Sequence, residues 1–222
     1  MHACIRTVII FFFLLLTLSS TLSGCKKNIT LKQTVFFEDA EDGMASNMLA
    51  QTGTGYNVYN LVKPFGGSNV VGFFNHTVLS LKLDTLPPHN MVYVEFDLYT
   101  HDKWEGNRVG LPGIVDVWNI RVNDGYQLST TFSNVPWQMQ SYPEWIGGGA
   151  GPTVPRGNAM DTLLPGRCLW EAKNNGTSKY KIAFSRPHTE KFLLLQLNDA
   201  LQGSNCEKSW SIDNILIQAI TN

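Results

Sequence analysis

The sequence has little excess of either charge, few cysteines and almost no helical periodicity. Each of these shortages excludes a class of partner, site or fold. Seventeen Lys and Arg stand against 18 Asp and Glu, a formal net charge of −1. The chain therefore lacks the basic patch that nucleic-acid binding needs, and we expect no nucleic-acid partner. Apolar residues at helical spacing extend no further than a turn near Met44–Leu49 or Asp199–Gln202. We find no internal repeat and no second domain.

The first 24 residues predict an export signal that is not part of the fold. Arg6 gives a positive start, and Val8–Leu16 is an apolar run too short to span a bilayer in the mature protein. Leu22–Cys25 (LSGC) resembles a bacterial lipobox, in which the signal peptidase cuts before the cysteine and the cysteine carries the lipid. We therefore expect lipidation at Cys25, a lipid anchor in the membrane, and a bacterial cell-envelope location, periplasmic or surface-exposed. The alternative is an ordinary secretory signal with a chance cysteine.

Two of the four cysteines remain for the folded domain. Cys4 leaves with the leader and Cys25 takes the lipid, which leaves Cys168 and Cys206. In an oxidising compartment such a pair predicts a disulfide, worth about 4 kcal/mol on the chain-entropy model. The alternative is two unpaired thiols. Zinc is not expected, because neither thiol has a second Cys or His at ligand spacing.

Residues 33–222 predict a single all-β domain, preceded by a polar tether at residues 25–32. The clearest strands are Met91–Tyr99 and Asp116–Val122, in which apolar and polar residues alternate. Further strands are predicted at Gln33–Phe37, Tyr56–Val62, Val70–Phe74, Val78–Leu83, Tyr126–Phe132, Trp137–Tyr142, Cys168–Ala172, Lys179–Phe184, Phe192–Leu197 and Ser209–Ile217. Short strands with regular turns are typical of an antiparallel β-sandwich, and we predict jelly-roll order with the first and last strands adjacent.

Several stretches resemble a jelly-roll domain that recurs in secreted bacterial proteins. They are Leu86–Asn107, Asp116–Ile120, Gln140–Pro143 and Phe184–Ile217, and the pieces FDLY, DKWEGN and SWSIDN are the most specific. The opening FFEDAEDG and the closing SWSIDN also resemble the ends of MAM-type and carbohydrate-binding-module jelly rolls. The resemblance implies a concanavalin A-like sandwich, usually non-catalytic and often holding a structural calcium ion. The chain departs from the pattern at Glu207-Lys208, where relatives often carry an acidic pair.

Oxygen-bearing side chains at two places are candidate ligands for a structural Ca²⁺ ion. The candidates are Asp102, Glu105, Asn107, Glu38 and Asp213. The first three fall within six residues around Gly106, and the last two meet if the terminal strands pair. The alternatives are a solvated acidic loop, with Lys103 or Arg108 compensating its charge, and a buried Asp capped by backbone amides. The spacing is not that of an EF-hand.

Three aromatic residues in polar surroundings are candidates for ligand binding: Trp104, Tyr142 and Trp145. Sugar rings stack their C–H faces on indole, while amides and carboxylates bind the hydroxyls. Trp104 and Trp145 are expected to be exposed, whereas Trp118 and Trp210 lie in strands and are expected in the core. The alternative is that all of these aromatic residues are core or loop-anchoring residues.

The sequence therefore predicts a lipid-anchored extracytoplasmic binding domain for carbohydrate or another surface component, such as a surface protein. A first alternative is a glycan-active hydrolase or lyase on the same sandwich, using Glu95, Asp97 and His101. The third carboxylate of the E-x-D-x-x-E pattern of laminarinase-type sandwich hydrolases is missing, and no G-x-S-x-G elbow is present. A second alternative is a purely structural envelope lipoprotein.

Overall fold

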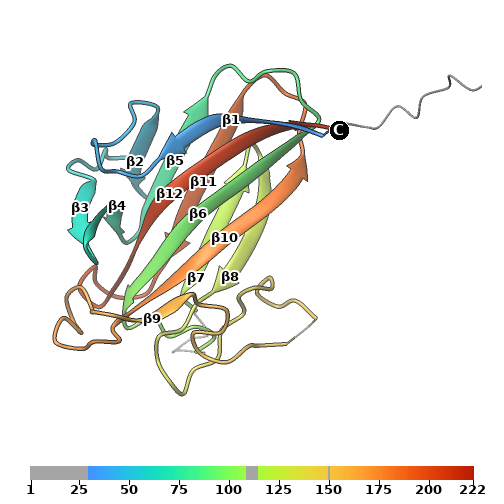
Figure 1. Cartoon of the computed structure of the whole chain (residues 1–222). Helices are drawn as coiled ribbons and strands as arrows, with labels where there is room; N and C mark the ends of the chain where they lie inside the picture. Colours follow the sequence, from blue (N-terminus) through green and yellow to red (C-terminus); the bar gives the residue numbers. More distant parts are fainter. Residues whose placement is uncertain (1–29, 109–114, 150) are drawn as a thin grey trace, which may run out of the picture. The chain divides into compact units, whose positions relative to one another are not determined.

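The computed structural model describes residues 30–108, 115–149 and 151–222 (Figure 1). The predicted export signal and Cys25 lie outside these residues. The fold itself spans Lys32–Thr221. In the part of the chain that is described, no helix is long and apolar enough to cross a bilayer.

The regular elements of the described residues are all β-strands. They are β1 (Leu31–Glu38), β2 (Met48–Thr52), β3 (Val62–Phe65), β4 (Ser68–Phe74), β5 (Thr77–Leu83), β6 (Met91–Asp102), β7 (Val117–Val122), β8 (Gly125–Thr131), β9 (Asp161–Leu164), β10 (Thr177–Pro187), β11 (Leu193–Ala200) and β12 (Lys208–Thr221). They form two sheets, ordered β3-β4-β12-β6-β10-β9 and β2-β5-β11-β7-β8, and β1 also pairs with β12. The all-β prediction and the adjacency of the first and last strands are confirmed.

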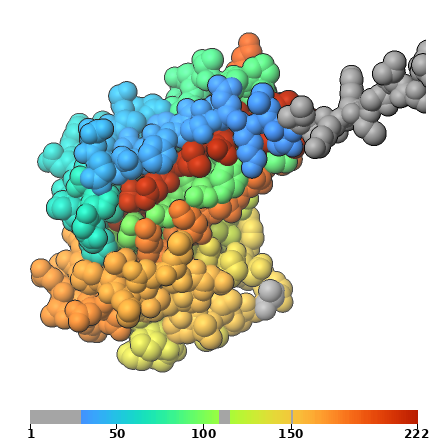
Figure 2. Space-filling view, viewed as in Figure 1, coloured from blue at the N-terminus to red at the C-terminus, as the bar shows by residue number. Residues whose placement is uncertain are grey.

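The sheet order is that of a jelly roll. Eight strands, β4 to β8 and β10 to β12, pair antiparallel as the two arms of one long hairpin: β4 with β12, β5 with β11, β6 with β10, and β7 with β8. Successive pairs fall alternately in the two sheets, so the hairpin wraps around the core. Figure 2 shows the outer face of the larger sheet, where β12, β6 and β10 run side by side between the N-terminal strands and the loops of residues 132–176.

The core lies between the two sheets and follows the alternation read from the sequence. On β6, Val92, Val94, Phe96 and Leu98 are fully buried, and the Phe96 ring packs against Trp118 of the opposite sheet. Trp118 and Trp210 are both buried, as predicted. Each such side chain contributes about 1.5–3 kcal/mol through removal of apolar surface from water.

Two predicted strands, Cys168–Ala172 and Trp137–Tyr142, are wrong, because hydrogen bonds of the Asp102 and Gln140 side chains help to shape turns and a loop there. The N–H groups of Cys168 and Trp170 donate to the Asp102 carboxylate, so Cys168–Ala172 forms turns. Trp137–Tyr142 is a loop folded around the buried Gln140, whose Oε1 accepts N–H groups from Ser133 and Arg156. 

Other strand boundaries also differ from the predictions. The predicted Tyr56–Val62 strand keeps only Val62, at the start of β3. The predicted turn near Met44–Leu49 instead leads into β2, because Met48–Thr52 pairs along β5. Pairing between distant segments overrides local preference here.

Candidate functional site

A groove opens at one side of the sandwich, between the edges of the two sheets. Its walls are Ile120, Gln127, Leu128, Tyr142, Pro143, Trp145, Ile182, Ala183 and Phe184, and its volume is about 260 Å³. β8 is the last strand of its sheet, and β9 pairs with β10 only around Thr177 and Lys179. Beyond Lys179 the outer edge of β10 therefore has no partner strand in the described chain, and the sandwich is open there.

Trp145 lies at this groove and is 44% exposed. The segment that carries it is fixed to β8 on both sides. The N–H of Ile146 donates to the Ser129 carbonyl at 2.8 Å, and the Thr130 hydroxyl donates to the Glu144 carbonyl at 2.7 Å. The backbone on both sides of Trp145 is therefore held in position before any ligand arrives, which lowers the entropy cost of binding.

Tyr142 forms the inner part of the same groove. Its ring packs against Phe132 and Tyr180, with centroid distances of 4.8 and 5.3 Å. Burial raises the pKa of the Tyr142 phenol, so the group is neutral and its hydroxyl donates to the Lys181 carbonyl at 3.5 Å. The structure thus brings two of the three predicted aromatic residues together, and their role in binding a ligand stays a prediction.

Gln127 is a groove residue that sequence reasoning missed. Ile120 pairs with Leu128 and Arg121 with Tyr126, which leaves Gln127 as the extra residue of a β-bulge on the edge strand. Bulges re-aim side chains and are frequent at binding sites. Within the described residues the Gln127 amide has no hydrogen-bond partner, so its donors and acceptor are free for a ligand. The alternation of the sequence gives no sign of the bulge.

Trp104, the third predicted aromatic, is not at the surface, and the expectation that it is exposed is wrong. It is fully buried, its Nε1 donates to the Ser209 carbonyl at 2.8 Å, and its ring packs edge-on against Phe132. The loop around it folds inward, because Gly106 lies so close to the chain opposite that a Cβ there would be 2.2 Å from the Met139 carbonyl oxygen.

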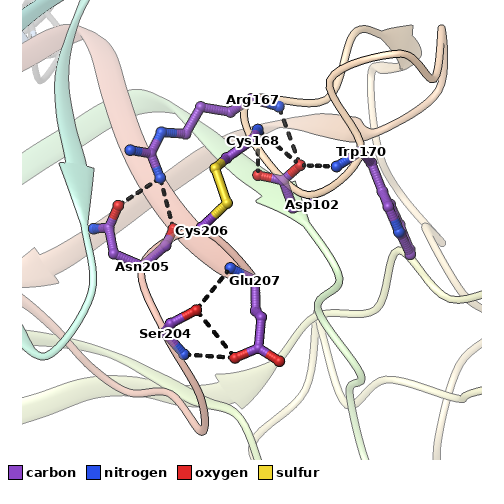
Figure 3. The surroundings of a disulfide bond; sticks show 8 residues. All are labelled: Asp102, Arg167, Cys168, Trp170, Ser204, Asn205, Cys206 and Glu207. Carbon is purple, nitrogen blue, oxygen red and sulfur yellow. Dashed lines mark hydrogen bonds between the residues drawn. A yellow bond between two sulfur atoms is a disulfide. The ribbon is translucent and has the colours of Figure 1, made fainter.

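The candidate calcium ligands of this loop already have partners in the protein. Asp102 is fully buried and accepts N–H groups from Arg167, Cys168 and Trp170 (Figure 3). The Asn107 side-chain oxygen accepts hydroxyls from Thr131 and Ser141. The other candidate of the loop, Glu105, binds cationic side chains.

Lys208 provides the main charge compensation in this region. Its ammonium group is buried, 2.6 Å from an Asp116 oxygen and 3.2 Å from a Glu105 oxygen. Glu105 also pairs with Lys103 and Arg108, the two compensators that the sequence suggested. Burial works against ionisation of Glu105, but Lys208 and Arg108 outweigh it and lower the pKa of that carboxyl.

Glu38 and Asp213, the remaining candidates, do not share a site. Glu38 accepts N–H groups from Ala40 and Ala45, whereas Asp213 lies opposite Asp97 on β6. Among the described residues, no three His, Cys, Asp or Glu side chains come close enough to hold a metal ion. The donor set as arranged does not fit a calcium ion, and calcium binding stays a prediction.

The residues of the enzymatic alternative lie on the outer face of β6, and none of them lines the groove. Asp97 forms ion pairs with Lys179 and Lys181, both at 2.9 Å. Glu95 pairs with Lys181 at 3.2 Å. His101 is fully buried, and burial lowers its pKa well below the usual value, so it stays neutral. It contacts no solvent through which a substrate would reach it.

Asp213 is the described carboxyl with the strongest pH response expected. Burial raises the pKa of its carboxyl to about 6. The Asn214 N–H and Lys179 lower this pKa, whereas Asp97 and Glu41 raise it further. The unfolded value is about 3.9, so the folded state binds this proton more tightly. Ionised Asp213 therefore costs stability above pH 6, and this cost disappears as the pH falls towards 4.

We expect Asp213→Asn to raise the melting temperature at pH 8 and to leave it nearly unchanged at pH 4. The gain at pH 8 should be on the order of 1 kcal/mol after solvent screening. Thermal melts at both pH values measure it, with Asp84→Asn, in an exposed pair with Lys82, as the control. An equal shift at both pH values would show that folding does not raise the pKa of Asp213, and would contradict this expectation.

Comparison with known proteins bears on the fold alone. No family model and no curated protein sequence matches the chain. Similar solved structures include a family 35 carbohydrate-binding module from Clostridium thermocellum, with 11% identity over 84% of this chain and 97% of that chain and a TM-score of 0.35. The K3 adhesin domain of Lys-gingipain from Porphyromonas gingivalis W83 has 8% identity over 84% of this chain and 100% of that chain, with a TM-score of 0.44.

A family 35 module from Paenibacillus barcinonensis has 14% identity, covers 84% and 98% of the two chains, and has a TM-score of 0.32. At identities and TM-scores in this range, the similarity concerns the fold and not the function.

Proposed function

We propose that this domain binds a neutral carbohydrate in the groove beside Trp145. The observation that supports it is a half-exposed indole, fixed to β8 by backbone hydrogen bonds, next to an amide without an internal partner. The C–H face of a sugar ring packs on the indole, and the Gln127 amide donates to and accepts from its hydroxyl groups. The groove holds no nucleophile or paired carboxylates, so the proposed role is binding.

The size and polarity of the groove define the ligand class. About 260 Å³ lies below the range of sites that enclose drug-sized ligands, so one sugar unit of a longer glycan enters it. All nine lining side chains are uncharged. A charged sugar would lose hydration without gaining an ion pair there, so a neutral unit is favoured.

The proposed setting is outside the cytoplasm, with the domain held at the membrane through a lipid on Cys25. The Cys168–Cys206 disulfide supports an oxidising compartment. The lipobox-like Leu22–Cys25 supports the anchor. Labelled lipid on the wild-type protein and its loss in Cys25→Ser would test this part of the proposal separately.

Trp145→Ala should weaken binding of neutral glycans by about thirtyfold, because removal of a central aromatic contact typically costs about 2 kcal/mol. The matched control is Trp137→Ala: Trp137 is 78% exposed but lies outside the groove lining. Calorimetric titration with a panel of neutral and acidic oligosaccharides gives the affinities, and chromatography of the same mixtures detects cleavage. Equal losses in both variants would contradict the assignment, and released products would favour the enzymatic alternative.

A further inference from the structure

Two histidines from separate connections face each other at one end of the sandwich, away from the Trp145 groove. His89 lies between β5 and β6, and His188 lies between β10 and β11. The planes of their rings are inclined by only 14° and the centroids are 5.0 Å apart, so the rings lie edge to edge and nearly coplanar. His89 Nε2 is 2.7 Å from His188 Nδ1. His188 is buried and His89 is partly buried.

The neighbouring groups fix the proton on each ring nitrogen. His89 Nδ1 lies 2.6 Å from the Pro87 carbonyl oxygen, which only accepts, so this nitrogen carries a proton. In the neutral ring, His89 Nε2 is then an acceptor, and His188 Nδ1 must donate to it. His188 Nε2 is consequently an acceptor as well.

Asn123, in the β7–β8 turn, supplies the matching donor. Its Nδ2 lies 3.2 Å from His188 Nε2 and also donates to the Glu190 carboxylate. Its Oδ1 accepts the Leu194 N–H at 2.9 Å, which fixes the orientation of the amide. The hydrogen bonds form one directed chain, from Asn123 through His188 and His89 to Pro87, with each polar group satisfied.

This chain of hydrogen bonds has no position for an additional proton. If His89 were doubly protonated, His188 would have to move its own proton to Nε2, where it would face the Asn123 N–H. Turning the Asn123 amide would lose the bond from Leu194 and set its oxygen against the Glu190 carboxylate. A proton added directly to His188 Nε2 would also face the Asn123 N–H, and the Glu190 carboxylate, 4.0 Å from that nitrogen, is the acidic group that favours it.

We propose that His89, His188 and Asn123 form a proton-sensitive latch that holds three connections together and is released by acidification. The connections are those between β5 and β6, β7 and β8, and β10 and β11. The latch borders a polar pocket of about 370 Å³, lined by residues 122–125 and 186–190. Release frees the segments that carry Asn123 and Glu190 and changes the shape of that pocket.

The surrounding charges set the pH range. Burial and then His89 lower the pKa of His188. Glu190 raises it, Arg186 lowers it by less, and a hydrogen bond with the Phe192 backbone raises it least. Asp124, in the same pocket, is exposed. The unfolded value is about 6.5, so the latch contributes fully above that pH, and its contribution is lost as the pH falls below it.

Nitrogen NMR of ¹⁵N-histidine-labelled full-length protein tests the tautomers directly. At pH 7.5 we expect both His89 and His188 to be neutral with the proton on Nδ1. Between pH 7 and 5, hydrogen exchange at the Leu194 amide should accelerate about tenfold beyond its intrinsic pH dependence, because local opening exposes this amide. A proton on Nε2 of either ring at pH 7.5, or constant protection of Leu194, would overturn the latch.

His188→Gln tests the pH response by stability. The loss of melting temperature between pH 7 and 5 should be smaller in this variant than in wild type, and His76→Asn, which replaces an exposed histidine, should behave as wild type. The buried His101 and the Asp213 carboxyl contribute equally to all three proteins, so their effects cancel. The same pH dependence in His188→Gln and wild type would contradict the proposal, and the wild-type NMR result decides if the variant does not fold.

Discussion

Lys208→Met should destabilise the domain by about 3–5 kcal/mol, because it leaves the buried Asp116 carboxylate without its cation. The Lys208 ammonium lies between Asp116 and Glu105 at 2.6 and 3.2 Å, and its side chain is only 4% exposed. Asp116 also accepts N–H groups from Glu105 and Gln202. The ion pair therefore fixes the residue before β7 to the start of β12, and the Gln202 N–H fixes it to the β11–β12 connection. Urea unfolding measures the loss.

Lys82→Met is the matched control, because Lys82 pairs with Asp84 at the surface and such pairs contribute about 0–1 kcal/mol. Adding Asp116→Asn to Lys208→Met should restore part of the stability by removing the unpaired charge. If Lys208→Met unfolds at the same urea concentration as Lys82→Met, the buried pair does not have the role assigned to it.

The same geometry gives an expected result for calcium. Because Lys208, Lys103 and Arg108 already compensate Glu105, wild-type melting temperatures should be equal in excess Ca²⁺ and in chelator. A melting temperature that rises with free Ca²⁺, and loses this rise in Asp102→Ala, would establish the calcium site predicted from the sequence.

Removal of the Cys168–Cys206 disulfide should cost about 3–4 kcal/mol on the chain-entropy model. The two Cα atoms lie 5.1 Å apart and the cysteines are 38 positions apart in the chain, so the predicted bridge is confirmed. It holds the turn of residues 166–171 against the β11–β12 connection (Figure 3). The N–H groups that bind Asp102 belong to this turn, so its loosening also leaves a buried carboxylate with fewer donors.

The double variant Cys168→Ala, Cys206→Ala should therefore unfold at a lower urea concentration than wild type. Wild type in reducing agent should approach the behaviour of the double variant, and reducing agent should not alter the variant further. Equal stability of wild type and variant would show that the turn is held by its hydrogen bonds alone.

Much of the fold could be predicted from the sequence, because strand alternation is a local signal. Met91–Tyr99 and Asp116–Val122 alternate clearly, and they became β6 and β7. The disulfide followed from counting the cysteines left when Cys4 of the predicted leader and the predicted lipidation site Cys25 are set aside. The sheet order could not be predicted from a local signal, because it depends on which distant segments of the chain pair. The jelly-roll resemblance supplied it.

The candidate site was predictable only in part. The exposure of Trp145 could be predicted from its Gly/Pro-rich surroundings. The acidic neighbours of Trp104 predicted that this residue is exposed as well, but it is buried. Asp102 is satisfied by amides more than sixty residues away, which no local pattern reveals. Gln127 depends on the register between β7 and β8, where a single extra residue redirects a side chain.

The proposed carbohydrate site is tested most directly by NMR titration of the ¹⁵N-labelled domain with neutral oligosaccharides. We expect the Trp145 indole N–H and the Gln127 side-chain amide to shift together with one dissociation constant, while the indole N–H of Trp137 stays unchanged. Shifts confined to Trp137, or none at Trp145 and Gln127 with any neutral oligosaccharide of the panel, would contradict the account.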